Sequence, residues 1–233
     1  MKPRQFPEES SAGRKRRVAK IIAALQREYP EAKCSLNHSN AFELSIATIL
    51  SAQCTDKRVN KVTPELFGKY PSPEHFASAS LEDLEEAIRS TGFYRNKARS
   101  IKGFAAGIIG EYEGNVPDSM EDLTALPGIG RKTANVILGV AHDVPGIVVD
   151  THVKRISRLL GLTTETDPEK IEYDLQSLVP EEHWVQWAHL IIDHGRAVCK
   201  ARTPRCRECV LLDYCPSGRA KLGVENTKIS MNE

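Results

Sequence analysis

The chain has 233 residues, of which 40% are hydrophobic and 27% charged, and its formal net charge is +1. This composition predicts a folded globular protein with one large or two small domains, and it excludes a disordered chain, which has few apolar residues and a large net charge. No apolar run approaches the ~18 residues of a membrane-spanning helix. The N-terminal segment shows no secretory cleavage site and, unlike mitochondrial leaders, it is not poor in acidic residues. We therefore expect a cytoplasmic protein with no membrane partner.

The charge is unevenly distributed along the chain. Residues 1–20 and residues 196–221 each carry a net charge of +5, which leaves −9 for the remainder. Two basic ends indicate a surface that binds a polyanion, but a pair of solvated tails would carry the same charges. The charges alone leave both interpretations open.

Apolar side chains recur at helical spacing through most of the chain. Residues 1–13, rich in Pro, Ser and Gly, are typical of a flexible tail, and only residues 147–149 look extended. The stripes that predict helices lie at residues 18–25, 42–53, 81–88, 98–112, 137–141, 153–160, 171–178 and 184–192. We therefore predict an all-α fold of nine or ten helices joined by short loops, and interpret His152 and His194 as ordinary helix residues.

Four of the six cysteines lie close together near the C-terminal end, at Cys199, Cys206, Cys209 and Cys215. A disulfide framework is typical of small secreted domains, which this chain does not resemble. Zinc sites usually place two close ligand pairs a dozen or more residues apart, whereas three short loops here gather four thiolates around one centre. The spacing therefore favours a [4Fe–4S] cluster, with zinc as the alternative.

A second motif is the sequence LPGIGRKT at residues 126–133, between short predicted helices at about 120–125 and 131–142. Its alternating glycines allow positive φ angles and let backbone N–H groups approach a ligand. These groups lie at a helix N-terminus, which favours an anion such as a DNA phosphate. Two glycines alone would fit an ordinary corner, but the full segment is a helix-hairpin-helix signature. We expect DNA contacts from Gly128, Gly130, Arg131 and Thr133.

Lys132 lies in the first turn of the helix that follows, where the helix dipole and partial burial would favour a neutral amine. A nucleophilic lysine needs such surroundings, because an ordinary one is neutral in about one molecule in a few thousand at pH 7. Asp150, before the helix at 153–160, is by local sequence an N-cap. A cationic Lys132 that only contacts phosphate remains the alternative.

These motifs together resemble the endonuclease III family of helix-hairpin-helix DNA glycosylases. The hairpin with Lys132, the VDTH sequence around Asp150 and the cysteine spacing occur in the family's order, and the resemblance extends over residues 14–216. It implies a bifunctional DNA glycosylase/AP lyase, which removes oxidised pyrimidines from duplex DNA and cleaves the strand at the abasic site. Lys132 would attack the sugar C1′ with help from Asp150, while the four cysteines would hold a structural [4Fe–4S] cluster.

The resemblance also implies how the chain is organised. A helical barrel would comprise residues 34–144, with the hairpin at about 120–139. The cluster domain would combine residues 14–33 with residues 145–216, and residues 217–233 would form a C-terminal tail. We expect a monomer that binds double-stranded DNA with damaged bases or abasic sites, in the cytoplasm at the nucleoid.

Other DNA contacts are expected from two wedge residues and from a basic loop. Gln53 matches the family's glutamine that fills the gap left by a flipped base. The family's second wedge is a leucine, whereas this chain has Phe93, which is also able to insert between bases. This difference leaves open which opposite bases and lesions are preferred. In the loop between the first two cysteines, the expected contacts are Lys200, Arg202 and Arg205.

Two other functions fit part of the sequence. A monofunctional glycosylase of the same superfamily has the cluster and the aspartate, but it lacks the lysine and carries an additional C-terminal domain. A non-catalytic helix-hairpin-helix module needs neither the cluster nor Asp150. Lys132 and the short segment after Cys215, about eighteen residues, favour the bifunctional enzyme.

Overall fold

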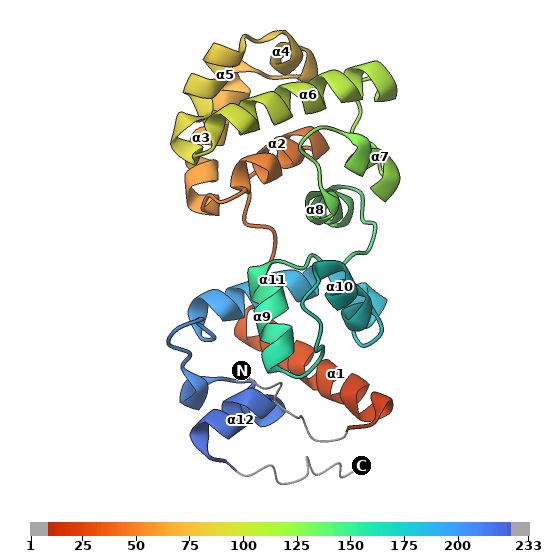
Figure 1. Cartoon of the computed structure of the whole chain (residues 1–233), viewed down its shortest axis with the longest axis vertical. Helices are drawn as coiled ribbons and strands as arrows, with labels where there is room; N and C mark the ends of the chain where they lie inside the picture. The colour runs from red at the N-terminus through yellow and green to blue at the C-terminus, as the bar shows by residue number, and fades with distance from the viewer. Residues whose placement is uncertain (1–8, 225–233) are drawn as a thin grey trace. The chain divides into compact units, whose positions relative to one another are not determined.

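The structure of the chain is a computed structural model that describes residues 9–224 (Figure 1). Within that range it contains helices and no β-strand, which confirms the predicted all-α class. The chain divides into two compact units, one formed by residues 34–146 and the other by the segments before and after it. The division falls next to the domain boundaries expected at residues 34 and 144.

The unit of residues 34–146 is a bundle in which the long helix α6 packs against α4 and α5, while α2 packs against α3 and α8. Its core is mainly apolar, with Phe76 and Phe104 fully buried and Phe42 stacked on Phe104. The α-helices are α2 (Ala41–Ser51), α3 (Asp56–Lys69), α4 (Pro73–Ser78), α5 (Leu81–Ile88), α6 (Tyr94–Tyr112), α7 (Met120–Ala125) and α8 (Arg131–Ala141). A 3-10 turn, η1 (Arg89–Thr91), joins α5 to α6.

The predicted number of helices is too low, because α3, α4 and α12 have no counterpart among the predicted stripes. Helix α3 continues through Pro64, a residue that removes one backbone N–H donor and normally ends a helical prediction. The burial of Val59 and Leu66 in the core holds that helix together despite the proline. Helices α4 and α12 have only six and seven residues, too few to show a helical period.

The other unit is organised around α11, which packs against α1 and α9. Val18 and Ile21 on α1, Val153 on α9 and Trp187 on α11 are fully buried. The α-helices are α1 (Ser11–Glu28), α9 (Thr151–Leu159), α10 (Pro168–Gln176), α11 (Trp184–Ala197) and α12 (Pro216–Leu222). Three 3-10 turns complete the described part of this unit: η2 (Glu181–His183), η3 (Cys206–Glu208) and η4 (Leu212–Tyr214). None of the described helices has the length and hydrophobicity needed to cross a membrane.

Both predicted tails extend too far, because helices occupy the residues at their inner ends. Helix α1 begins at Ser11, because the Ser10 hydroxyl caps it by accepting a hydrogen bond from the Gly13 N–H at 3.1 Å. A serine and a glycine that suggest a tail are therefore part of a helix start. At the other end, α12 occupies residues 216–222. The outer parts of both predicted tails, residues 1–8 and 225–233, lie outside the described residues.

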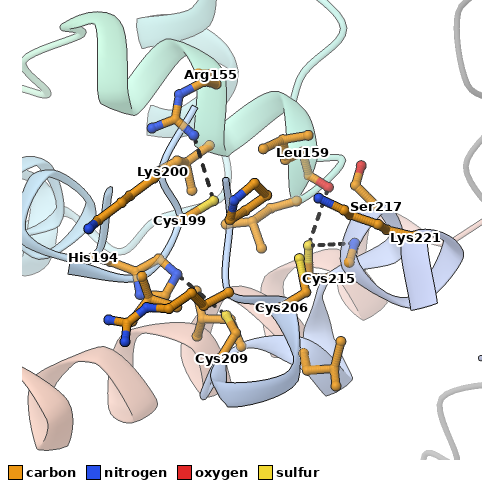
Figure 2. Close-up of a pocket in the computed structure, with 18 of the residues that line it drawn as sticks. Arg155, Leu159, His194, Cys199, Lys200, Cys206, Cys209, Cys215, Ser217 and Lys221 are labelled. Atoms are coloured by element: carbon orange, nitrogen blue, oxygen red, sulfur yellow. Dashed lines mark hydrogen bonds between the residues drawn. The ribbon is translucent and has the colours of Figure 1, made fainter. Parts of the chain in front are cut away.

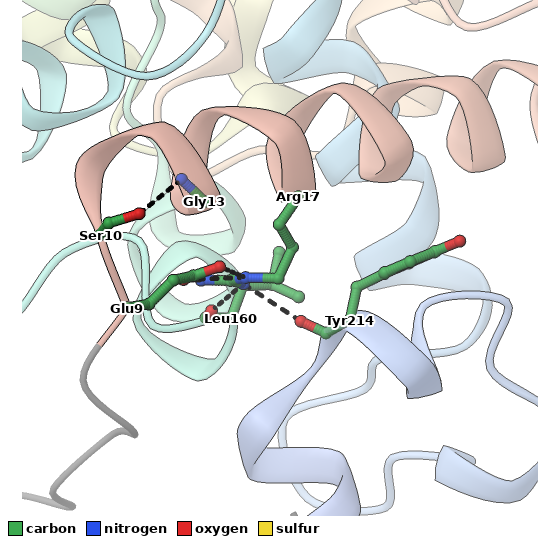
Figure 3. A network of polar contacts seen from close by, with 6 residues as sticks. All are labelled: Glu9, Ser10, Gly13, Arg17, Leu160 and Tyr214. Carbon is green, nitrogen blue, oxygen red and sulfur yellow. Dashed lines mark hydrogen bonds and ion pairs between the residues drawn. The ribbon is translucent and has the colours of Figure 1, made fainter. Parts of the chain in front are cut away.

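A buried arginine ties α1 to the segment that leads to the last cysteine (Figure 3). The side chain of Arg17 is only 5% exposed, and its Nη2 lies 2.7 Å from Oε2 of Glu9. Its Nη1 donates to the carbonyl oxygens of Leu160, at 2.7 Å, and Tyr214, at 3.1 Å. Leu160 follows α9, and Tyr214 immediately precedes Cys215. One guanidinium therefore joins three separate segments of this unit.

The change Glu9→Gln is expected to lower the free energy of unfolding by about 2–3 kcal/mol, near the lower end for a buried pair, because it leaves the Arg17 charge uncompensated. Urea denaturation measures this loss. The control is Glu86→Gln, which removes an exposed ion pair with Arg89 and should cost less than about 1 kcal/mol. Equal losses in the two variants would contradict a special role for the buried pair.

Candidate functional site

The turn between α7 and α8 has a shape that only glycine permits at its centre. Gly128 has φ = +81°, and a Cβ atom there would lie 2.6 Å from Cβ of Ser100 on α6. Leu126 and Ile129 on either side are buried, and the Ile129 N–H donates to the Leu126 carbonyl at 3.2 Å. The turn is therefore anchored by apolar side chains while its backbone approaches α6 closely.

Gly130 serves a different purpose from the one predicted. Its φ is −99°, so a positive φ angle is not the reason for this glycine. It is the N-cap of α8, makes no side-chain cap hydrogen bond, and has only open space where a Cβ would be. The first backbone N–H groups of a helix have no partner within the helix, and a side chain at the N-cap often accepts from them. A glycine there leaves room for an external acceptor.

Lys132 is exposed in the first turn of α8, between the half-buried Arg131 and Thr133. The partial burial predicted for Lys132 is therefore wrong. The reason is geometric: α8 turns its Ala134, Ile137 and Leu138 face to the core, and Lys132 lies off that face. What remains of the predicted environment is the position of Lys132 in the first turn of α8.

Asp150 is the N-cap of α9, as its position in the sequence predicts. Its Oδ1 accepts a hydrogen bond from the Val153 N–H at 2.8 Å, and the side chain is half-buried. The cap fixes the direction of the carboxylate. Asp150 and Lys132 belong to different units of the chain.

Gln53 and Phe93, the predicted wedges, are both exposed and both have a left-handed backbone. Gln53 follows the end of α2 with φ = 52°, and Phe93 precedes α6 with φ = 49°. The Phe93 side chain is 61% exposed, the most exposed of the large apolar side chains in the described part of the chain. Such φ angles are uncommon for residues other than glycine and cost about 1–2 kcal/mol. Glu113 and Asp143 in the same unit have the same backbone conformation, so what distinguishes Phe93 is its exposed aromatic ring.

The four clustered cysteines line a single pocket of about 480 Å³ (Figure 2). They come from the end of α11, from η3 with the residue after it, and from the start of α12, and all are free thiols. Burial, with a smaller contribution from the neighbouring cysteines, raises the pKa of Cys209 to about 11. Burial also raises the pKa values of Cys199 and Cys215. Three neighbouring sulfurs that resist ionisation on their own suit a cationic group that binds thiolates.

Two side chains that the sequence interpretation missed contact these sulfurs. Nη1 of Arg155 lies 3.6 Å from Sγ of Cys199, and Nε2 of His194 lies 3.5 Å from Sγ of Cys209 (Figure 2). His194 is therefore not an ordinary helix residue. The available signal was its position on the helix that leads directly to Cys199.

The protonation state of His194 follows from its surroundings. Burial and the nearby Arg155 charge lower the pKa of His194 to about 4, so its ring is neutral at pH 7. Its Nδ1 lies 3.1 Å from the Tyr29 hydroxyl, whose own pKa is raised to about 12, mainly by burial. When the protonated hydroxyl donates to Nδ1, the ring proton lies on Nε2 and is directed at the Cys209 sulfur.

The basic loop after Cys199 carries three exposed cations, at Lys200, Arg202 and Arg205. Arg205 also braces the loop, since its Nη2 donates to the Ala197 carbonyl at 2.8 Å and its Nη1 pairs with Glu208 at 3.0 Å. The structure thus places the predicted DNA contacts of this loop at the surface. It gives Arg205 an internal role that the sequence did not indicate.

The two glycines of the α7–α8 turn should respond differently to substitution. Gly128→Ala is expected to lower the free energy of unfolding by at least about 1–2 kcal/mol, because it combines a left-handed alanine with the contact to Ser100. Gly130→Ala should stay within about 0.5 kcal/mol of the parent, since its backbone angles suit any residue. Thermal or urea unfolding measures both, and equal losses would contradict the geometry described for the turn.

Comparison with known proteins relates these features to a family. Residues 46–181 match the model of the HhH-GPD superfamily of base excision DNA repair proteins. The chain is 51% identical to endonuclease III of Synechocystis sp. over 90% of its length and 96% of that protein. It is 48% identical to endonuclease III of Bacillus subtilis, over 83% of the chain and 89% of the relative.

Solved structures give the same result. A non-covalent endonuclease III–DNA complex superposes with a TM-score of 0.85 at 44% identity, covering 90% of this chain and 98% of that one. A trapped endonuclease III–DNA covalent intermediate gives a TM-score of 0.85 at 45% identity, covering 89% of this chain and 98% of that one. The chain therefore belongs to the endonuclease III family of the HhH-GPD base excision DNA repair proteins.

Proposed function

We propose that the chain is a bifunctional DNA glycosylase and AP lyase that removes oxidised pyrimidines from duplex DNA in base excision repair. The observation that carries this function is the exposed amine of Lys132, one turn or less from the backbone N–H groups at the start of α8. A phosphate bound to those groups brings a sugar of the same strand close to the amine. The covalent DNA intermediate trapped in a relative supports the same chemistry.

The reaction divides into two stages at one nitrogen atom. The Lys132 Nζ forms a bond to C1′, the glycosidic bond breaks, and the damaged base leaves with the bonding electrons. The sugar ring then opens and leaves an imine between Nζ and C1′. The imine makes a C2′ proton acidic, and its removal expels the 3′ phosphate oxygen, so the strand breaks without any metal or nucleotide taking part.

Asp150 assists the attack by Lys132. An amine must be neutral to attack, and lysine amines are mostly protonated at neutral pH. A carboxylate held in a fixed direction by its cap bond to Val153 accepts the amine proton and stabilises positive charge that develops on the sugar.

The exposed wedge residues serve the step that precedes chemistry. A base must leave the stack before C1′ is accessible, at a cost of a few kcal/mol. Gln53 fills the gap, and Phe93 inserts its ring between neighbouring bases. The hairpin, through Gly128, Gly130, Arg131 and Thr133, and the basic loop, through Lys200, Arg202 and Arg205, bind the phosphates. The protein acts as a monomer in the cytoplasm, at the nucleoid, on double-stranded DNA with damaged bases or abasic sites.

The four cysteines that line the pocket hold a [4Fe–4S] cluster. No three described His, Cys, Asp or Glu side chains are arranged around a single metal ion, but the pocket is large enough for a polynuclear group. All four donors are thiols, which is the ligand set of such clusters. Arg155 and His194 direct N–H groups at two of the sulfurs and so stabilise thiolate ligands. When bound, the cluster supplies structural support for the basic loop.

Borohydride reduction is expected to trap a covalent complex between the chain and a thymine-glycol duplex, because it converts the imine to a stable amine. Lys132→Arg should abolish trapping while it largely preserves DNA affinity, since a guanidinium still binds phosphate but does not attack C1′. Lys132→Gln should lose both the covalent trapping and the DNA affinity. Gel electrophoresis and a binding titration measure the two quantities.

The control for these variants is Lys61→Ala, which removes an exposed amine on α3 of the same unit. Its trapping and DNA affinity should match those of the parent. A trapped band that survives in Lys132→Arg would show that another amine is the nucleophile. The complete absence of a band with the parent chain would contradict the lyase activity.

Purified under anaerobic conditions, the protein is expected to be brown, with broad absorption near the blue end of the visible spectrum and about four iron atoms per chain. Iron and sulfide analysis checks this directly. Cys209→Ser should lower the iron content and shift the absorption. A colourless protein with one equivalent of zinc would contradict the cluster assignment.

A further inference from the structure

One lysine in the unit of residues 34–146 is buried without a role in the chemistry described above. The side chain of Lys97, in the first turn of α6, is 4% exposed. Its Nζ donates to two neutral acceptors, the carbonyl oxygens of Leu50 and Thr91, each at 2.8 Å. Taking an ammonium out of water costs several kcal/mol, so a lysine retained at such a place needs a compensating function.

The two carbonyl groups belong to segments that are far apart in the sequence. Leu50 lies in the last turn of α2, where carbonyl groups have no partner within the helix. Thr91 is the last residue of η1, just before Gly92. Because both oxygens contact the same nitrogen, Lys97 holds the end of α2 beside the end of η1.

Each of these segments leads directly to a wedge residue. Gln53 comes three residues after Leu50, and Phe93 comes two residues after Thr91. Both wedge residues have the left-handed backbone that is strained for their side chains. Strained backbone of this kind persists only where the surrounding structure fixes it.

Lys97 also holds the second wedge through its own backbone. The Lys97 N–H donates to the Phe93 carbonyl oxygen at 3.1 Å, as does the Asn96 N–H. Phe93 is therefore held at two points. Helix α6 binds the carbonyl group of Phe93 itself, and the Lys97 side chain binds the chain two residues before Phe93. No comparable tie from Lys97 reaches the α7–α8 turn among the contacts of the described residues.

We propose that Lys97 is a positioning residue that fixes the spacing between the Gln53 and Phe93 loops, so that both side chains enter the duplex as one rigid wedge. Insertion has to offset the cost of unstacking a base pair, and every degree of freedom lost by a loose loop on insertion adds to that cost. Lys97 removes that freedom in advance. This role rests on the proposed function, in which Gln53 and Phe93 displace the base.

The chain contains a matched control on the same helix. Lys102, five residues further along α6, also donates its Nζ to two carbonyl oxygens, those of Ala77 and Ala79. These residues lie at the end of α4 and in the link to α5, away from both wedge loops in the sequence. Lys97→Met and Lys102→Met therefore remove the same kind of interaction from different loops.

The experiment measures single-turnover base excision from a thymine-glycol duplex with saturating enzyme, in two backgrounds. In the parent, Lys97→Met is expected to slow base excision by about tenfold or more, a loss of about 1.4 kcal/mol of transition-state stabilisation. Lys102→Met should slow it less than about twofold. In a Gln53→Ala, Phe93→Ala background, Lys97→Met should add less than about twofold, because there is no wedge left to position.

A merely structural role would give a different pattern. Equal slowing by Lys97→Met in both backgrounds, or equal effects of Lys97→Met and Lys102→Met, would overturn the proposal. If Lys97→Met does not fold, Lys97→Arg serves instead, because it keeps the charge and the N–H donors on a side chain of different length. Lys97→Arg should slow base excision in the parent and have little effect in the double-alanine background. Hydrogen exchange should accelerate at residues 51–54 and 91–94 in Lys97→Met and not at residues 126–131.

The failure of the proposed function is recognisable separately. If the parent chain neither excises the base nor forms the reduced covalent complex, the glycosylase activity itself is wrong. If the double-alanine variant excises bases at the parent rate, the wedge assignment is wrong, and the positioning role of Lys97 falls with it. A third outcome would overturn the positioning role alone. In that case the parent is active, the double-alanine variant is slow, and Lys97→Met slows base excision by the same factor in both backgrounds.

Discussion

Backbone groups left without partners at helix ends are the constraint on which the rest of this structure depends. Every α-helix leaves N–H groups at its start and carbonyl groups at its end that must bind something. The chain satisfies many of these with its own side chains: Ser10 caps α1, Asp150 caps α9, and Lys97 binds a carbonyl at the end of α2. At the start of α8 it places Gly130, which has no side chain to offer.

In the proposed function, that difference gives the unit of residues 34–146 a place for a DNA phosphate. There the backbone N–H groups at the start of α8 bind the phosphate, and the close approach of Gly128 to α6 holds the turn that precedes them. Lys132 stands in the same helical turn, so whatever holds the phosphate also sets the distance between the amine and the sugar. Its exposure suits a group that has to reach a substrate.

The sequence was sufficient for features that depend on local pattern. The hairpin with α7 and α8, the Asp150 cap and the grouping of four cysteines all follow from short motifs, and the structure confirms the hairpin helices, the cap and the shared pocket. Features that depend on distant contacts were not predictable. Core burial overrides Pro64 in α3, and the contact of His194 with Cys209 exists only because α11 and the cysteine loop fold together.

The proposed reaction requires that the Lys132 amine bonds to deoxyribose, and mass spectrometry of the reduced protein–DNA complex locates that bond. After nuclease and protease digestion, we expect the sugar remnant to be attached to Nζ of Lys132. A remnant found instead on another amine, such as Lys154 beside Asp150 or the N-terminal amino group, would contradict it.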